Sequence, residues 1–236
     1  MDLAVFGANG PTGRLVVRQA LTAGHHVVAV TRKPDRYPVT SPHLDVVAAD
    51  VTDPDDVERV LSTGPQAVIS TFGVPYGRSE ITVYSQGIAH ITRAMTIHGV
   101  ERLVCVTSTT VATDDAPGES LFGRKVLLPF LRNVVGRTLY DDMERMEAIV
   151  RSSGLDWTVV RPGGLFDGVV PTADYEVAPR RLSGRVTSRA DLAETLVREA
   201  VTPLHPRSVI EVMTRSGLPS FTTFVKEAFG IGGGAS

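Results

Sequence analysis

Short apolar runs rich in β-branched residues recur along the chain, most of them bounded by turn-forming residues. Runs of about four to eight such residues are typical of buried strands. The sequence predicts strands at Leu3–Phe6, Val27–Thr31, Leu44–Ala48, Ala67–Ser70, Leu103–Thr107, Trp157–Val160 and Val209–Val212.

Segments with helical periodicity lie between most of these runs. An amphipathic stretch spans Arg14–Ala23, and Asp53 caps a segment with an acidic first turn. Further helices are expected over Glu80–His98, over Tyr140–Ser153 and from Ser188 onward. Strands that alternate with helices favour an α/β fold, a doubly wound parallel sheet that binds ligands at the carboxyl ends of its strands.

The composition fits one domain of this type. The 236 residues are 42% hydrophobic, which suffices for a full core. We expect a single domain over residues 1–229 and a flexible glycine-rich tail at residues 230–236. The net charge of −2 offers no broad basic surface for nucleic acid.

The single cysteine, Cys105, excludes an intramolecular disulfide, and the six histidines lack metal-ligand spacing, so no metal site is expected. The N-terminal residues show no charged segment followed by an apolar signal core. No apolar run approaches the roughly 20 residues of a membrane span. These features predict a cytoplasmic protein without integral membrane association, and they leave the oligomeric state open.

The turn after the first strand carries three glycines, Gly7-x-x-Gly10-x-x-Gly13, directly before the first amphipathic helix. Glycine adopts positive φ, and without a Cβ the backbone can approach a phosphate at the helix N-terminus. Pro11 suits the first helical turn, where no N–H donor is needed. Strand, turn and helix together predict a dinucleotide site. Its expected residues here are Gly7, Asn9, Gly10, Pro11, Thr12 and Gly13.

The spacing of this turn resembles that of short-chain dehydrogenase/reductase-like proteins. Residues 7–13 are similar to the atypical NAD(P)H-binding branch of that superfamily, which includes NmrA-like proteins and the flavin reductase also called biliverdin reductase B. A second match covers residues 142–165, and the resemblance extends through nearly the whole chain. It implies a Rossmann-like fold and a nicotinamide cofactor.

The residues after the second strand bear on the choice of cofactor. An NAD-specific protein usually offers an acidic side chain to the ribose hydroxyls there. This chain offers Arg32, which can lie over the adenine and grip a 2′-phosphate, while Lys33 or Arg36 adds charge. NADP(H) is therefore favoured over NAD(H), although an ordinary solvated loop is the alternative interpretation.

The residues after the third and fourth strands are expected along the cofactor. Asp50 and Val51 resemble a family motif in which the Asp side chain and the next N–H meet adenine, and the alternative is that Asp50 starts a turn. Thr71, Phe72 and Gly73 are expected beside the ribose and pyrophosphate, where Gly73 allows close approach.

Ser108 follows the fifth strand and matches the serine of the flavin reductase motif Cys-Thr-Ser, so the resemblance makes it the candidate catalytic residue. The alternative is a strand-end hydroxyl bonded to the backbone. Thr107 is expected to help position the reacting rings.

The second half of the chain supplies further candidates by resemblance. Met143 stands where atypical relatives carry Lys or His near the nicotinamide. Arg161 is followed by a turn that consists of Pro162, Gly163 and Gly164, whose backbone N–H groups are expected to hold the nicotinamide carboxamide. Asp191 is expected to be structural.

Typical short-chain reductases use a Tyr-x-x-x-Lys pair, in which the cation lowers the phenol pKa. None of the three lysines, Lys33, Lys125 and Lys226, follows a tyrosine by four residues, and Tyr140 is followed at that spacing by Glu144. We therefore expect hydride transfer from NADP(H) to a flat acceptor such as a flavin or quinone, which delocalises the added charge. A non-catalytic NADP(H) sensor of the NmrA-like type is the alternative.

Residues 114–138 form a lid-like insertion with an apolar segment at residues 121–135. Long insertions at a ligand-binding edge are often lids or binding loops. Its apolar side chains would cover a flat substrate, form a self-association patch or pack on the core, and the sequence leaves these alternatives open.

Overall fold

The structure is a computed structural model that describes residues 1–74, 79–112, 114, 116–118, 132 and 136–220. Its central sheet confirms the expected, mostly parallel architecture. Its strands are β1 Asp2–Phe6, β2 His26–Thr31, β3 Leu44–Ala48, β4 Ala67–Ser70, β5 Arg102–Val106, β6 Asp156–Pro162, β8 Tyr175–Ala178 and β10 Ser208–Thr214. Within the described residues they form one sheet in the order β3-β2-β1-β4-β5-β6-β10-β8, in which β8 alone is antiparallel to its neighbour. The predicted strands correspond to β1 to β6 and β10.

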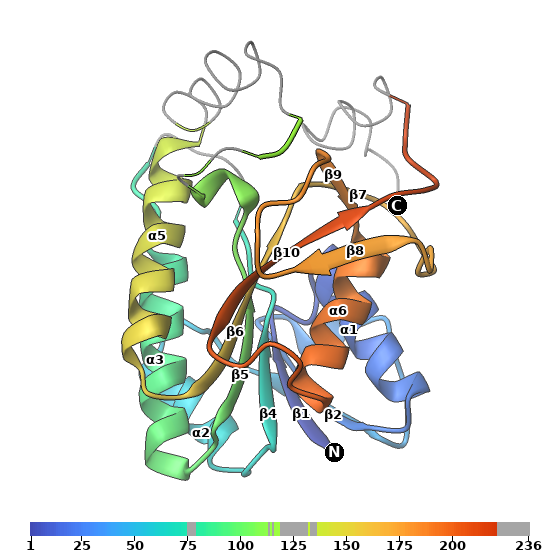
Figure 1. Cartoon of the computed structure of the whole chain (residues 1–236). Helices are drawn as coiled ribbons and strands as arrows, with labels where there is room; N and C mark the ends of the chain where they lie inside the picture. The colour runs from blue at the N-terminus through green and yellow to red at the C-terminus, as the bar shows by residue number, and fades with distance from the viewer. Residues whose placement is uncertain (75–78, 113, 115, 119–131, 133–135, 221–236) are drawn as a thin grey trace.

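Helices cover both faces of the sheet (Figure 1). Their bounds are α1 Pro11–Thr22, α2 Pro54–Leu61, α3 Val83–His98, α5 Arg137–Ser152 and α6 Arg189–Val201. On β1, Leu3 and Val5 pack with the α1 and α6 side, whereas Ala4 and Phe6 pack with the α2, α3 and α5 side. Burial of both faces explains why the strands read as continuous apolar runs rather than alternating ones.

Two short strands lie outside the main sheet and were not predicted from the sequence. β7 Gly164–Phe166 and β9 Val186–Ser188 pair with each other in parallel. Each has three residues, and β8 has four residues without an alternating apolar pattern. Such lengths are too short for periodicity to distinguish a strand from a loop.

Helix α3 begins at Val83 rather than at the expected Glu80, at a point where another helix caps it. Asp142 of α5 is fully buried and accepts hydrogen bonds from the backbone N–H groups of Tyr84 at 2.8 Å and Ser85 at 3.3 Å. A carboxylate at a helix N-terminus satisfies orphan N–H donors and interacts favourably with the helix dipole. This contact fixes α3 against α5.

The sequence-based insertion at residues 114–138 lies largely outside the described residues, and the glycine-rich tail at residues 230–236 lies wholly outside them. Among the helices that the structure describes, none is long and apolar enough to cross a membrane.

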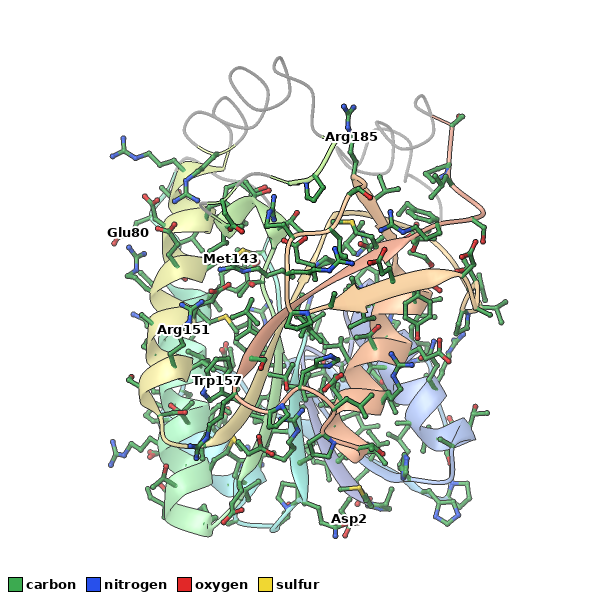
Figure 2. The ribbon with its side chains drawn as sticks, viewed as in Figure 1. Asp2, Glu80, Met143, Arg151, Trp157 and Arg185 are labelled. Atoms are coloured by element: carbon green, nitrogen blue, oxygen red, sulfur yellow. The ribbon has the colours of Figure 1, made fainter. Side chains whose placement is uncertain are left out.

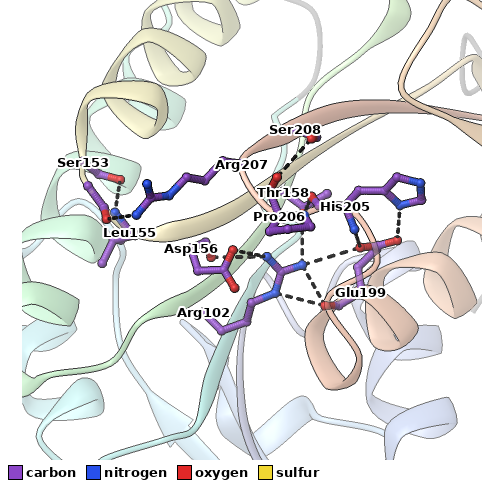
Figure 3. Close-up of polar contacts among 11 residues, drawn as sticks. Arg102, Ser153, Leu155, Asp156, Thr158, Glu199, His205, Pro206, Arg207 and Ser208 are labelled. Atoms are coloured by element: carbon purple, nitrogen blue, oxygen red, sulfur yellow. Dashed lines mark hydrogen bonds and ion pairs between the residues drawn. The ribbon is translucent and has the colours of Figure 1, made fainter.

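A buried ionic cluster ties α6 to the sheet at the amino ends of β5 and β6 (Figure 3). The guanidinium of Arg102 donates to the carbonyl oxygen of Glu199 at 3.0 and 2.7 Å and to the hydroxyl of Thr158 at 2.7 Å. The fully buried Glu199 carboxylate lies 3.6 Å from that guanidinium and 2.8 Å from Nδ1 of His205. Burial lowers the pKa of Arg102, and the Asp156 and Glu199 carboxylates act in the opposite direction.

We predict that Arg102→Leu lowers the free energy of unfolding by about 3–5 kcal/mol, because it leaves Glu199 as a buried charge without its guanidinium. Urea unfolding followed by circular dichroism measures this loss. Arg207→Ala is the control, since Arg207 donates one hydrogen bond to the Gly154 carbonyl at 3.2 Å. A loss of less than about 1 kcal/mol for Arg102→Leu would contradict the assignment, since surface contacts are worth that little.

Candidate functional site

The glycine turn after β1 packs against the backbone that follows β4. A Cβ added at Gly7 would lie 2.5 Å from the backbone nitrogen of Phe72, and one at Gly13 would lie 2.2 Å from the carbonyl oxygen of Gly7. Gly7 also has a φ of +79°, which favours glycine. These two glycines are therefore required by the protein's own packing.

Gly10 is less restricted, because its backbone does not require glycine and an added Cβ would make one close contact rather than a clash. Its φ of −72° and ψ of 163° are open to any residue, and an added Cβ would meet only the Gly7 carbonyl oxygen, at 3.3 Å. The side of the turn that lacks a Cβ is thus left for something other than protein. A phosphate group fits this role.

The N-terminus of α1 supplies the donors for such a group. Pro11 is its first residue, Gly10 at the N-cap makes no side-chain cap, and the first turn contains no acidic residue. The first N–H groups of a helix have no intrahelical partner and carry the positive end of its dipole. The turn and helix therefore fit the pyrophosphate of a dinucleotide.

Side chains of the turn are held by arginines. Asn9 accepts a hydrogen bond from Nε of Arg14 at 3.0 Å, and the buried Thr12 hydroxyl lies 3.4 Å from Nη1 of Arg189. Both arginines lie outside the glycine pattern itself. The sequence resemblance places residues 184–193, which include Arg189, beside the cofactor site, but it gave neither arginine a role of its own.

The basic residues expected near the adenosine are exposed at the carboxyl ends of β2 and β3. Arg32, Lys33 and Arg36 are all exposed, and Arg36 ends the short 3₁₀ helix Pro34–Arg36. Hydrogen bonds from Thr52 lower the pKa of Asp50, and the charge of Arg32 acts in the same direction. Because Thr31 pairs with Ala48, Arg32 and Asp50 follow the ends of two adjacent strands.

Asp50 starts a turn, which is one of the two roles that the sequence allowed for it. Its Oδ1 accepts hydrogen bonds from the N–H of Thr52 at 3.0 Å and from the Thr52 hydroxyl at 2.8 Å. The Val51 side chain packs on α3, where a Cβ added at Gly87 would lie 2.9 Å from it. This packing sets the distance between α3 and the turn.

The segment after β4 is fixed from both sides. The hydroxyl of Thr71 donates to the carbonyls of Phe6 at 3.1 Å and Gly7 at 3.3 Å. The rings of Phe72 and Tyr84 lie 6.0 Å apart, and a Cβ added at Gly73 would lie 3.4 Å from the Tyr84 hydroxyl. Thr71 and Phe72 thus support the glycine turn directly.

Ser108 and Thr107 point their hydroxyls to different partners. Ser108 Oγ accepts a hydrogen bond from the N–H of Thr110 at 3.2 Å, which caps the short helix η2 Thr109–Val111. As an acceptor there, the serine keeps its own proton for another partner. The buried Thr107 hydroxyl instead donates to Glu147 at 2.8 Å. This side chain therefore stabilises the residues behind the site and does not line it.

Glu147 is the centre of a buried charge cluster between α5 and the ends of β5 and β6. Arg161 binds it through two hydrogen bonds of 2.8 and 2.7 Å, and Arg151 lies 2.6 Å away. Burial acts to raise the pKa of Glu147, but the hydrogen bonds and charge of Arg161 outweigh it and the pKa is lowered. The carboxylate therefore stays ionised and fixes the strand ends.

Two further arginines hold the η2 segment that Ser108 caps. Arg132 pairs with Glu144 and donates to the Thr110 carbonyl at 3.0 Å. Arg181 pairs with Glu211 and donates to the Thr109 carbonyl at 3.2 Å. Neither contact could be predicted from local sequence pattern, because each joins segments that are far apart in the chain.

The expected role of the Gly163 and Gly164 N–H groups is wrong. Gly163 donates to the Thr187 hydroxyl at 2.9 Å, and Gly164 donates to the Arg185 carbonyl at 2.8 Å, so neither is available for a carboxamide. In a parallel ladder successive N–H groups point to opposite sides. The N–H of Leu165, between two residues that pair with β9, therefore points away from β9 and replaces them as the candidate donor.

Two other expected residues have clear surroundings. Met143 projects from α5 into the apolar cluster beneath that helix, 8% exposed (Figure 2). Pro162 ends β6 and is buried. Asp191 is fully buried and accepts hydrogen bonds from Thr172 at 2.7 Å and Thr214 at 2.5 Å, a structural arrangement.

These features define a dinucleotide-binding α/β protein, and comparison with known proteins identifies the family. The chain belongs to the NAD(P)H-binding family, whose family model matches residues 7–203. An uncharacterized chloroplastic protein of Arabidopsis thaliana is 32% identical over 223 residues, which cover 91% of this chain and 77% of the relative. An uncharacterized sugar epimerase of Bacillus subtilis, YhfK, is 25% identical over 84% of this chain and 86% of its own.

Solved structures share the fold. The oxidoreductase ylbE of Lactococcus lactis has a TM-score of 0.75 at 18% identity, covering 98% of this chain and 96% of its own. The anaerobillin reductase ChuY of Escherichia coli O157:H7 has a TM-score of 0.71 at 22% identity, covering 93% and 100%. These likenesses confirm the Rossmann-like fold.

We predict that Gly10→Val abolishes dinucleotide binding and leaves the fold intact, because the backbone tolerates the change while the added methyl groups enter the phosphate space. Calorimetric titration with NADPH and circular dichroism measure the two effects. Gly24→Ala is the control: its Cβ meets nothing within 4 Å, and its φ of +81° costs stability without affecting binding. Native circular dichroism with unchanged NADPH affinity in Gly10→Val would place the phosphates elsewhere.

Proposed function

We propose that the protein is an NADP(H)-dependent oxidoreductase that passes hydride to a flat acceptor such as a flavin or quinone. The observation that carries the proposal is the presence of a dinucleotide turn after β1 and a firmly held serine after β5, at the same edge of the sheet on either side of β4. Ser108 caps a segment that two arginine–carboxylate pairs hold in place. Such rigidity suits a site that mainly orients two rings.

The residues of helix α5 favour a hydride acceptor that can be reduced without a proton-donating side chain. At the spacing of the Tyr-x-x-x-Lys pair, Tyr140 is buried and Glu144 is bound by Arg132. Met143 has no proton to give. A flavin or quinone spreads the incoming charge over its ring system, so water can supply the proton.

The cofactor, when bound, supplies a hydride from C4 of its nicotinamide. The protein's residues would bind and orient it: the glycine turn and α1 would hold the phosphates, and the Leu165 N–H, which points away from β9, is the candidate donor to the carboxamide. The Ser108 hydroxyl, whose oxygen accepts from the Thr110 N–H, would donate a hydrogen bond to the bound ring system and keep its proton. Thr107, through Glu147 and Arg161, keeps the ends of β5 and β6 in register.

Two finer assignments belong to the same proposal. The exposed cations Arg32, Lys33 and Arg36 favour NADP(H), and the family resemblance puts the Asp50 side chain against adenine. A reducing, cytoplasmic location is consistent with Cys105, a fully buried thiol whose pKa burial raises.

We predict that NADPH binds at least about tenfold more tightly than NADH, a difference of about 1.4 kcal/mol. Arg32→Ala should remove most of this preference by weakening NADPH binding alone, since NADH has no 2′-phosphate. Calorimetric titration with both cofactors measures it, and Arg93→Ala, an exposed arginine on α3, is the control. Equal affinities in the wild type would show that the basic loop is ordinary solvated surface.

We predict that Ser108→Ala lowers kcat by about 10- to 100-fold, or about 1.4–2.7 kcal/mol, with a smaller effect on NADPH affinity. Orientation matters most in the transition state, so the loss falls on kcat. NADPH absorbance followed with FMN, riboflavin and small quinones measures turnover. Ser108→Thr keeps the hydroxyl and should retain most activity. If tightly bound NADPH reduces no acceptor in such a panel, a non-catalytic NADP(H) sensor replaces the enzyme.

A further inference from the structure

The side chain of Arg189, the first residue of α6, lies against the glycine turn. Its Nη1 is 3.4 Å from the hydroxyl of Thr12 in the first turn of α1, and its Nε donates to Asp167 at 2.8 Å. The Gln19 amide of α1 also donates to the Ala190 carbonyl at 3.1 Å. The start of α6 therefore lies against α1 near Gln19, and the Arg189 side chain reaches the first turn of α1 at Thr12.

Arg189 is held in a place that electrostatics disfavours. A cation at a helix N-terminus faces the positive end of the dipole. Arg189 occupies this position on α6 and lies beside the same end of α1, yet its side chain is only 21% exposed. Asp167 offsets the guanidinium, and the buried Asp191 carboxylate is occupied by Thr172 and Thr214. The positive end of α1 has no acidic residue of its own.

We propose that Arg189 binds the pyrophosphate of the dinucleotide. The planar guanidinium matches phosphate oxygens, and it is already placed beside the hydroxyl of the turn that the phosphates approach. The turn itself, residues 7–13, contains no lysine or arginine. A positively charged side chain that contacts the phosphates therefore comes from another part of the chain. Asp167 orients Arg189 through Nε and leaves the Nη groups to face the turn.

The loop that contains Asp167 packs closely against the start of α6. A Cβ added at Gly168 would lie 2.3 Å from the hydroxyl oxygen of Ser188, the N-cap of α6. The segment after β7 is therefore pressed onto the start of α6. Without Arg189, the Asp167 carboxylate would remain near the phosphates and repel them.

This assignment depends on neither the acceptor nor the choice between NADPH and NADH, because both cofactors contain the pyrophosphate. Calorimetric titration of Arg189→Ala should show NADPH and NADH weakened by the same factor, about 10- to 100-fold. Adenosine 2′-monophosphate, which lacks the pyrophosphate, should bind Arg189→Ala as it binds the wild type. Arg189→Lys should be intermediate, since it keeps the charge but not the fork.

Two further variants separate charge from packing. Asp167→Asn in the Arg189→Ala background should recover part of the lost NADPH affinity, because it removes a negative charge near the phosphates. Gln19→Ala removes a different hydrogen bond between α1 and α6, the one to the Ala190 carbonyl, and should leave both affinities within about twofold. The proposal is overturned if Arg189→Ala leaves both affinities unchanged, if it weakens only NADPH, or if Gln19→Ala weakens binding as much. A failure to reduce any acceptor would leave these binding results unaffected.

Discussion

The close approach of two backbones, at the turn after β1 and the segment after β4, is the constraint on which the rest of the site depends. The space at Gly7 is so small that an added Cβ would lie 2.5 Å from the Phe72 nitrogen. Thr71 closes the same contact through hydrogen bonds to the Phe6 and Gly7 carbonyls. Because these backbones touch, α1 starts directly at the edge of the sheet with its N–H donors facing the ligand side.

Buried charge pairs hold the remainder of that edge. Glu147 joins α5 to the ends of β5 and β6, while Arg132 and Arg181 hold the η2 segment from two directions. A buried charge is tolerated only when it is paired and hydrogen-bonded, and such a pair fixes geometry because its partners cannot move independently. The edge is therefore a rigid surface, as ring-to-ring transfer requires.

The sequence predicted the parts of this architecture that depend on local pattern. The strand Ala67–Ser70 was found with its observed bounds, because burial on both faces leaves a continuous apolar run. The turn at Gly7 was found because glycine is chemically required there. The start of α3, by contrast, is set by Asp142 of α5, and the Gly163 and Gly164 N–H groups are used by β9 and its neighbours. Contacts between segments distant in the chain leave no trace in local pattern.

The central claim is that this edge orients one face of the nicotinamide toward a flat acceptor. NADPH carrying deuterium on one or the other face of C4 tests it in a single turnover with excess protein and FMN, with the NADP⁺ product analysed by mass spectrometry. The account predicts that NADP⁺ from one labelled cofactor has lost its deuterium and that NADP⁺ from the other has kept it. Tight NADPH binding without oxidation, or equal loss of deuterium from both faces, would contradict it.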